Sequence, residues 1–311
     1  MTVAVLNAFA RPFLEGRLPS WVEPHYFASV EEMNQLAPRA EIGWFDSFEM
    51  GGPAEPVRLA TDLKWLNTVA AGVEVFPLDL MRERGVVLTN GAGLNAITIA
   101  EYAVMGMLVI AKGYRQVVRS QDRREWLHEA PGRQELYESR ALIVGAGGIG
   151  GRIAELLRPW GVDVTTVRRT PGPGVLTPDQ WRGRLGEFDW IVIAVPSTPD
   201  TDKMMGAAEF SAMKPGAAVL NFARGAVLDQ DALVAAVQAG QVGGAFLDVT
   251  DPEPLPSDHP LWAFDNVHIT SHLSGRSQNT LIRRSCERFL ENLARYERGE
   301  PLVALVELTL G

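Results

Sequence analysis

The sequence has a single cysteine, no long apolar run and no excess of basic residues, and each lack excludes a class of protein. Cys286 alone cannot form an internal disulfide, and nothing else among the 311 residues favours an oxidising compartment, so we expect a cytoplasmic protein. The longest apolar run, Ala103 to Ala111, is less than half of the roughly 20 residues that a transmembrane helix needs, so we expect no membrane span. The formal charge of −9 disfavours general binding to nucleic acid or anionic lipid. Any phosphate must be bound locally.

The composition that remains is that of a folded protein. Apolar residues make up 46% and charged residues 22%, a balance typical of globular rather than disordered chains. At roughly 100 to 200 residues per domain, the length predicts two domains. Met1 to Ala10 has no basic residue ahead of its apolar ones, so we interpret it as a first buried strand rather than a signal peptide.

After Ala141, short apolar runs rich in β-branched residues alternate with helical patterns, as in the βαβ units of a parallel sheet. A helix is predicted from Ile149 to Trp160, with Gly161 placed to end it, and Asp229 to Ala239 repeats this plan. The predicted strands are Ala141 to Val144, Val162 to Val167, Trp190 to Val195, Ala217 to Phe222, Gly244 to Val249 and Asn266 to Thr270.

The N-terminal third also has an α/β pattern. Long helices are predicted from Ile97 to Val118 and from Gln278 to Tyr296, and we expect the chain to cross over and back. We therefore predict a discontinuous outer domain, residues 1–94 with 276–311, around a central domain of residues 95–275. The strand candidates of the outer domain are Val3 to Leu6, Ile42 to Phe45, Trp65 to Val69 and Val86 to Thr89.

The strongest local motif is a glycine-rich turn that matches G-x-G-x-x-G between a predicted strand and a predicted helix. Its residues are Gly145, Ala146, Gly147, Gly148, Ile149 and Gly150. Glycines permit a tight turn and a close approach of the backbone, so a pyrophosphate can bind the free N–H groups at the positive end of the helix. The alternative is a turn chosen only for packing, which the flanking strand and helix disfavour.

Folds of this kind that bind NAD usually carry an acidic residue about 20 positions further on, where it accepts hydrogen bonds from the adenosine ribose. This sequence has Arg168, Arg169 and Thr170 at that place. Two guanidinium groups would pair well with a 2′-phosphate, so the exchange predicts NADP(H) in preference to NAD(H). The alternative is a solvated surface pair.

Three further residues follow consecutive predicted strands: Arg224, Glu253 and His272. In an open parallel sheet, ligands bind outside the carboxyl ends of the strands, so all three are predicted to reach the dinucleotide. A histidine that is hydrogen-bonded to a carboxylate holds a fixed tautomer and suits proton transfer to a carbonyl oxygen. An arginine beside it can grip a carboxylate at two points and polarise the neighbouring carbonyl.

Each of these residues also has an ordinary structural interpretation. Arg224 could be a surface arginine, Glu253 a solvated loop residue, and His272 a strand-end histidine satisfied by backbone. Two histidines compete for the role of base. His268 lies inside a predicted strand, where packing is the expected role, and His259 lies in a turn. His25 and His128 have no placed partner.

With these motifs in order, the chain resembles the D-isomer-specific 2-hydroxyacid dehydrogenase family from about Trp65 through Glu300. Several long motifs in the right order make the likeness specific. The stretches that carry it are NGAGLNAITIAEYA (90–103), ALIVGAGGIGGRIAELLRPWG (141–161), VPSTPDTDKMM (195–205), MKPGAAVLNFARGAVLDQDAL (213–233), GGAFLDVTDPEPLP (243–256) and PLWAFDNVHITSH (260–272).

The resemblance implies two doubly wound parallel-sheet domains, a Rossmann cofactor domain inserted in a flavodoxin-like substrate domain. It implies catalytic roles for Arg224, Glu253 and His272, the first and last of which also bind substrate, and a backbone site for the substrate carboxylate at Ala71 and Gly72. Asp248 matches the aspartate that meets the nicotinamide carboxamide. The residues implied to contact the cofactor are Gly145, Gly147, Gly148, Ile149, Gly150, Arg168, Arg169, Thr170, Val195, Pro196, Ala223 and Asp248.

Some positions depart from the family pattern. Ser271 replaces a common proline, and Ser274 and Arg276 are polar where small apolar residues are frequent, which puts local substrate contacts in doubt. The arginines and AAGVE resemble the NADPH-dependent glyoxylate and hydroxypyruvate reductase branch. Trp44 could line the substrate cleft, as in that branch, or lie in the core.

We therefore predict a homodimeric reductase of a small 2-oxoacid, without a metal. Two alternatives stay open. One is a dinucleotide-sensing interaction protein without turnover, and the other is a dehydrogenase that oxidises another small acid.

Overall fold

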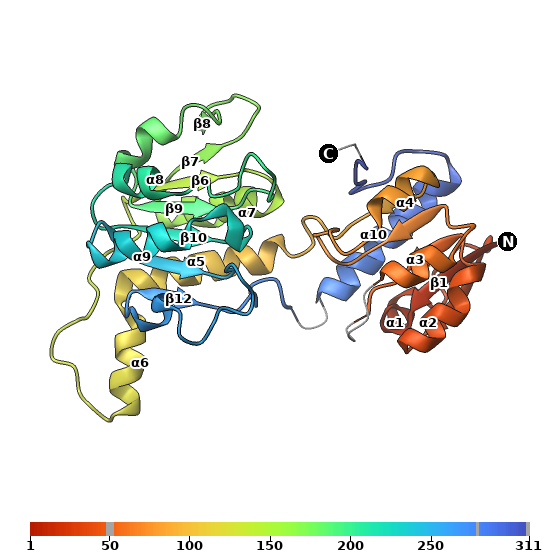
Figure 1. Cartoon of the computed structure of the whole chain (residues 1–311), viewed down its shortest axis with the longest axis horizontal. Helices are drawn as coiled ribbons and strands as arrows, with labels where there is room; N and C mark the ends of the chain where they lie inside the picture. The colour runs from red at the N-terminus through yellow and green to blue at the C-terminus, as the bar shows by residue number, and fades with distance from the viewer. Residues whose placement is uncertain (48–52, 278–279, 309–311) are drawn as a thin grey trace. The chain divides into compact units, whose positions relative to one another are not determined.

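The computed structural model describes residues 1–47, 53–277 and 280–308, and the chain forms two compact units (Figure 1). Unit 1 comprises Met1–Asn95 and Ser277–Gly311, and unit 2 comprises Ala96–Arg276. Both contain an all-parallel sheet with helices on its two faces. Parallel sheets need this double cover because both of their faces are apolar.

Within the described residues, the sheet of unit 1 has the strand order β2-β1-β3-β4-β5, which is the flavodoxin-like order. Its strands are β1 (Thr2–Asn7), β2 (Val22–Phe27), β3 (Ile42–Trp44), β4 (Trp65–Asn67) and β5 (Val87–Thr89). One face is covered by α1 (Arg11–Leu14) and α10 (Thr280–Glu297), and the other by α2 (Val30–Leu36), α3 (Ala54–Leu59) and α4 (Leu78–Glu83).

The strand β2 was not predicted from the sequence. It contains Glu23, Pro24 and His25, and a proline inside a run normally argues against a strand because it lacks an N–H donor. In the structure β2 is the edge of the sheet and pairs only with β1, so one side of its backbone needs no partner strand. His25, for which no partner was expected, lies 2.7 Å from Glu23 through its Nε2.

The described part of unit 2 has the strand order β12-β11-β10-β9-β6-β7-β8, which contains the Rossmann order 3-2-1-4-5-6 when the strands are counted from β6. The predicted fold class, a Rossmann domain inserted in a flavodoxin-like one, is confirmed. The strands are β6 (Arg140–Val144), β7 (Asp163–Val167), β8 (Val175–Leu176), β9 (Trp190–Ile193), β10 (Ala217–Asn221), β11 (Val242–Leu247) and β12 (Val267–Ile269).

Alternate residues of these strands enter two separate cores. Leu142 and Val144 face one core, and Ala141 and Ile143 face the other, as the two-residue period of a strand requires. The first core lies under α8 (Ala207–Ala212) and α9 (Gln230–Gln238), and the second under α5 (Ala96–Lys112) and α7 (Gly148–Leu157). These layers hold the carboxyl ends of the strands in one row.

The long helix predicted from Ile97 to Val118 is wrong in one respect. It is two helices, α5 and α6 (Tyr114–Asp122), separated by Gly113 with φ +59°. A Cβ at Gly113 would lie 2.9 Å from the backbone carbon of Pro131, so the crossing loop and the left-handed turn both require glycine there. Apolar periodicity runs across this break and conceals it.

Among the described residues, no single helix is long and apolar enough to cross a bilayer. Only α5 and α6 taken together, which bend by 72° at their junction, have the necessary length and composition.

Candidate active site

The glycine turn lies between β6 and α7, where its glycines have different reasons to lack side chains. Gly145 has φ +102°, and a Cβ on Gly150 would lie 1.8 Å from the oxygen of Gly145, so both are needed for the turn itself. Around Gly147 there is open space, with no atom within 4 Å of an added Cβ. Gly147 is also the N-cap of α7 and offers no side chain to cap it. The turn therefore leaves room for a phosphate at uncapped N–H groups, and it fits a dinucleotide.

The arginine pair adjoins this turn. The N–H groups of Gly145 and Ala146 both donate to the oxygen of Val167, the last residue of β7, at 3.1 Å. Arg168 and Arg169 follow directly and are exposed, and among the described residues neither forms an ion pair. Thr170, next along, is exposed as well. The residues that carry two unpaired guanidinium groups therefore follow directly on the backbone that contacts the glycine turn.

Other predicted cofactor residues lie at the ends of the neighbouring strands. Val195, after β9, comes within 2.9 Å of the Cβ position of Gly145, and Pro196 beside it is exposed. Ala223, after β10, is 5% exposed. Ile149 in the first turn of α7 is half-buried and packs on the second core.

Arg224 is carried by a short turn after β10. The side chain of Asn221 fixes this turn, because its Nδ2 donates to the oxygen of Arg224 at 3.0 Å and its Oδ1 accepts from the N–H of Ala223 at 3.0 Å. Arg224 is half-buried, with Nη1 2.8 Å from the oxygen of Ala223, and it has no ion pair among the described residues. Its guanidinium is available to an anion.

Gly225 brings the arginine turn against the loop that carries Glu253. A Cβ on Gly225 would lie 2.0 Å from the carbonyl of Thr250, so only glycine permits this approach. In the same loop, the N–H of Thr250 donates to Oε1 of Glu253 at 3.1 Å. The predicted arginine and glutamate are therefore held in adjoining turns.

The predicted pair of Glu253 and His272 is present. Nδ1 of His272 lies 2.9 Å from Oε2 of Glu253, and the two side chains are 49% and 40% exposed. With Oε1 bound to the Thr250 N–H and Oε2 bound to the ring, the carboxylate orients the imidazole. Because Nδ1 is engaged, Nε2 is the nitrogen left for proton exchange.

Asp248, at the end of β11, organises the histidine loop. Its side chain is 3% exposed and accepts from the hydroxyl of Thr270 at 2.7 Å and from the N–H groups of Leu273 and Ser274 at 3.0 Å each. The hydroxyl of Ser274 donates to its second oxygen. Ser271 and His272 have φ values of +51° and +56°, which cost energy for side-chain residues. These hydrogen bonds stabilise the turn that presents the histidine.

The competing residues have structural roles. His268 is half-buried in β12, and burial, together with the nearby Arg115 and Arg119, lowers its pKa to about 4. His259 accepts the N–H of Leu261 at 3.2 Å through Nδ1. Trp44 is 0% exposed, which supports the core interpretation over a place in the substrate cleft.

In unit 1, the loop after β4 contains Ala71 and Gly72. Its carbonyls are engaged: the oxygen of Ala70 accepts from the N–H of Gly91, and that of Ala71 from Nδ2 of Asn90, both at 2.7 Å. Among the described residues, no hydrogen bond uses the N–H of Ala71 or Gly72. A loop with occupied acceptors and free donors suits an anion.

Sequence reasoning missed the residues that hold this loop. Asp46, two positions after β3, accepts from the hydroxyl of Thr68 at 2.7 Å and from the N–H of Val69 at 2.8 Å. An acidic residue at the carboxyl end of an apolar strand was the available signal.

The family of the chain follows from comparison with known proteins. The model of the D-isomer specific 2-hydroxyacid dehydrogenase NAD-binding domain matches residues 104–274. The chain belongs to this family. It is an NAD(P)-dependent oxidoreductase, and the predicted family and enzyme class are confirmed.

Relatives of this dehydrogenase differ in activity. It is 31% identical to the human glyoxylate reductase/hydroxypyruvate reductase over 79% of this chain and 78% of that protein. It is 30% identical to the D-3-phosphoglycerate dehydrogenase of Archaeoglobus fulgidus over 82% of this chain, but spans only 49% of that protein. It is also 30% identical to the formate dehydrogenase of Arabidopsis thaliana over 79% of this chain and 66% of that protein.

Solved structures match almost the whole dehydrogenase. A family protein from Aeromonas salmonicida, 28% identical, has a TM-score of 0.85 with 99% of both chains covered. One from Xanthobacter autotrophicus, in complex with NADPH and MES, is 26% identical with a TM-score of 0.79, covering 99% of this chain and 98% of that one. The formate dehydrogenase of Staphylococcus aureus, in complex with NAD, is 25% identical with a TM-score of 0.72 and full coverage of both.

Proposed function

We propose that this dehydrogenase reduces a small 2-oxoacid of the glyoxylate or hydroxypyruvate type to the D-2-hydroxyacid, with NADPH preferred over NADH. The observation that carries the proposal is the 2.9 Å contact between His272 and Glu253, in a loop adjoining that of Arg224. The substrate domain is the predicted outer domain, residues 1–94 with 276–311, and the cofactor domain is the predicted central domain, residues 95–275, each within one residue of the units of the structure at every boundary. The predicted cytosolic location and the absence of a metal stay predictions.

In the proposed mechanism, Arg224 binds the substrate carboxylate and polarises the adjacent carbonyl, which a guanidinium without an ion pair permits. Glu253 holds Nδ1 of His272, so that Nε2 donates the proton to the ketone oxygen. Asp248 keeps the histidine loop in place, and its predicted contact with the nicotinamide carboxamide stays a prediction. NADPH, when bound, would supply the hydride that the carbonyl carbon takes up. The free N–H groups of Ala71 and Gly72 support their predicted role as a carboxylate site.

The preference for NADPH rests on Arg168 and Arg169, which are unpaired and follow β7 beside the glycine turn. A 2′-phosphate has two negative charges to offer them, whereas the diol of NAD has none. Thr170 adds a hydroxyl to the same loop. The Xanthobacter relative in complex with NADPH shows that the family includes such binders, although the Staphylococcus relative binds NAD.

Steady-state oxidation of NADPH with glyoxylate, hydroxypyruvate, pyruvate and bulkier 2-oxoacids tests the proposal. We expect the two smallest acids to give the highest kcat/KM, and Arg224→Ala to lower turnover and substrate binding together. Turnover of formate with NADP⁺ but of no 2-oxoacid would replace the proposal with acid oxidation. Cofactor binding without turnover of any acid would favour a sensor.

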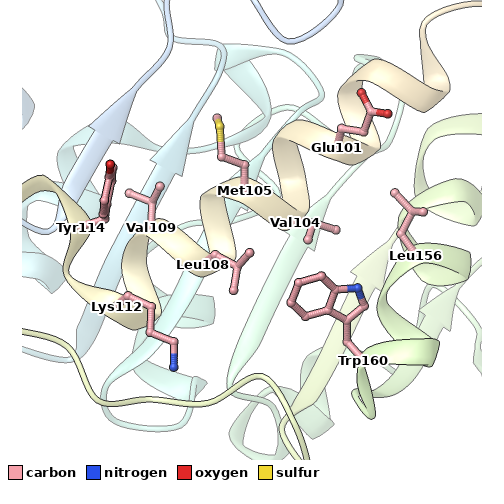
Figure 2. Close-up of a pocket in the computed structure, with 9 residues that line it drawn as sticks. All are labelled: Glu101, Val104, Met105, Leu108, Val109, Lys112, Tyr114, Leu156 and Trp160. Atoms are coloured by element: carbon pink, nitrogen blue, oxygen red, sulfur yellow. The ribbon is translucent and has the colours of Figure 1, made fainter.

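We also propose a homodimer. The exposed side of α5 borders a hollow of about 660 Å³, lined mainly by apolar side chains, with Leu156 and Trp160 beside the helix (Figure 2). Met105 and Trp160 are 42% and 49% exposed. Glu101 and Lys112 stand at opposite ends of this face, so two copies whose α5 helices pack antiparallel about a two-fold axis would pair unlike charges. Sedimentation equilibrium should give a dimer, and Met105→Glu should shift it toward monomer.

A further inference from the structure

The loop that precedes Gly72 is held by a network of side chains that the proposed mechanism does not use. Asp46 is its centre. One carboxylate oxygen accepts from the hydroxyl of Thr68 at 2.7 Å, and the other accepts from Nε1 of Trp44 at 2.6 Å and from the N–H of Val69 at 2.8 Å. The backbone oxygen of Asp46 accepts from Nδ2 of Asn7 at 2.7 Å. The network thus joins the carboxyl ends of β1, β3 and β4.

Thr68 connects Asp46 to the backbone of the loop. Its hydroxyl donates to Asp46 and accepts the N–H of Ala70 at 3.1 Å, so it fixes the backbone two residues before Gly72. The residue is 1% exposed, and its own N–H donates to the oxygen of Thr89 at 2.9 Å. The hydroxyl therefore donates to Asp46 and accepts from the loop, so it ties the loop backbone to the carboxylate.

The other side of the loop is held by the segment that follows β5. Nδ2 of Asn90 donates to the oxygen of Ala71, and the N–H of Gly91 donates to that of Ala70. Gly91 has to be glycine, because a Cβ there would lie 1.9 Å from the oxygen of Val69. Asn90 is itself fixed, since its Oδ1 accepts the N–H of Ala92 at 3.1 Å.

These contacts have a common effect on the hydrogen-bonding groups of the loop. The N–H groups of Val69 and Ala70 and the oxygens of Ala70 and Ala71 are all engaged by the network. The donors left over, among the described residues, include the N–H groups of Ala71 and Gly72. An oxygen left free at the same place would repel a carboxylate.

Burial raises the pKa of the Asp46 carboxyl more than the hydrogen bonds from Thr68, Val69 and Trp44 lower it. The surroundings of Asp46 therefore disfavour the charged form of the carboxyl, despite its hydrogen bonds. A carboxyl in surroundings that disfavour its charge is expected where position serves function.

We propose that Asp46, Thr68 and Asn90 are positioning residues for substrate: they hold the 69–72 loop so that the N–H groups of Ala71 and Gly72 remain free for the carboxylate of the 2-oxoacid. The inference rests on the proposed function, and it adds to it the side chains that shape a backbone site. None of the three residues touches the reacting atoms.

A pair of variants at one position separates positioning from packing. Thr68→Val keeps the shape of the buried side chain and removes the hydroxyl, whereas Thr68→Ser keeps the hydroxyl and removes a methyl group. We expect Thr68→Val to raise the KM for glyoxylate about tenfold, the effect of losing a hydrogen bond, with kcat within about twofold and the KM for NADPH unchanged. Thr68→Ser should behave as the wild type does. Glu83→Gln, an exposed change at the end of α4 in the same unit, is the control.

Binding measured without turnover separates this inference from the proposed function. Calorimetric titration of the NADP⁺-bound protein with oxamate should show the same loss of affinity in Thr68→Val. Asn90→Ala, at a half-buried residue, should give a loss of about threefold and serves if Thr68→Val does not fold. The inference alone would be overturned if the wild type is active and a folded Thr68→Val or Asn90→Ala variant keeps the wild-type KM for glyoxylate and the wild-type affinity for oxamate. A wild type that neither reduces glyoxylate nor binds oxamate would overturn both.

Discussion

The carboxyl edges of the two sheets build their sites from different parts of the chain. At the edge of the seven-stranded sheet, the groups suited to chemistry are side chains, namely Arg224, Glu253 and His272, each in a turn after its strand. At the edge of the five-stranded sheet, the groups suited to binding are backbone N–H donors, and the side chains there hydrogen-bond the loop instead.

The difference decides how each site tolerates substitution. Only proline removes a backbone donor, and any other substitution can at most displace it, so changes in unit 1 other than to proline should alter binding by modest factors. A catalytic side chain can be deleted outright, and the loss is then large. Substitutions at three places in unit 2 test this contrast: at His272, at the arginine pair after β7, and at His268 inside β12.

The largest effect is expected for His272→Ala. Removing the imidazole that faces Glu253 should lower kcat for 2-oxoacid reduction by about 10²- to 10⁴-fold, the usual contribution of a positioned acid, with little change in NADPH affinity. Stopped-flow kinetics of NADPH oxidation measures this directly. His128→Ala, at an exposed histidine, should leave the rate unchanged. A rate for His272→Ala equal to that of the wild type would remove the proton-donor role.

A smaller effect is expected at the arginine pair that follows β7 at the same edge of the sheet. Replacing Arg168 with Asp and Arg169 with Ser should lower kcat/KM for NADPH about 10- to 100-fold, because the charged hydrogen bonds to the 2′-phosphate are lost. The value for NADH should rise, since the new carboxylate can accept from the ribose hydroxyls. Arg158→Asp, also exposed in unit 2, is the control. If the ratio of kcat/KM for NADPH to kcat/KM for NADH does not change, the arginines are only a solvated surface pair.

The same contrast explains which parts of the molecule could be predicted from sequence. Strands such as β6 and β9 are buried on both faces and appear as apolar runs, whereas β2 contains a proline and shows no such pattern. Residue types with distinctive chemistry after these runs, such as Arg224 and His272, indicated a site. Ala71 and Gly72 carry no chemical signature, and their role was inferred only through resemblance to a family.

Contacts between distant loops were beyond prediction for a further reason. The partners of Asp46 come from β3, from the end of β4 and from the following loop, so the network exists only once the strands are aligned. The break at Gly113 likewise depends on Pro131, which the chain places there in three dimensions. Local pattern predicts elements, while these features depend on tertiary contacts.

The smallest effect is expected in the body of β12, the strand whose end carries the site. His268 has its pKa lowered to about 4 because burial and the nearby Arg115 and Arg119 disfavour its charged form. The unfolded chain takes up this proton near the ordinary pKa of 6.5, so the free energy of unfolding should fall as the pH drops from about 6.5 toward 4.

His268→Gln removes that titration. Between pH 7 and pH 5 the variant should lose about 1 kcal/mol less stability than the wild type, after allowance for solvent screening, or roughly 2 to 4 °C in Tm. Differential scanning calorimetry at both pH values measures it, with His128→Gln as the exposed control. Turnover at pH 7 should be retained, because the residue packs in the strand body and does not reach the row of turns. A large loss of turnover would instead mean that His268, inside β12, takes part in the reaction. The distinction between a structural strand and a functional turn after it would then be wrong.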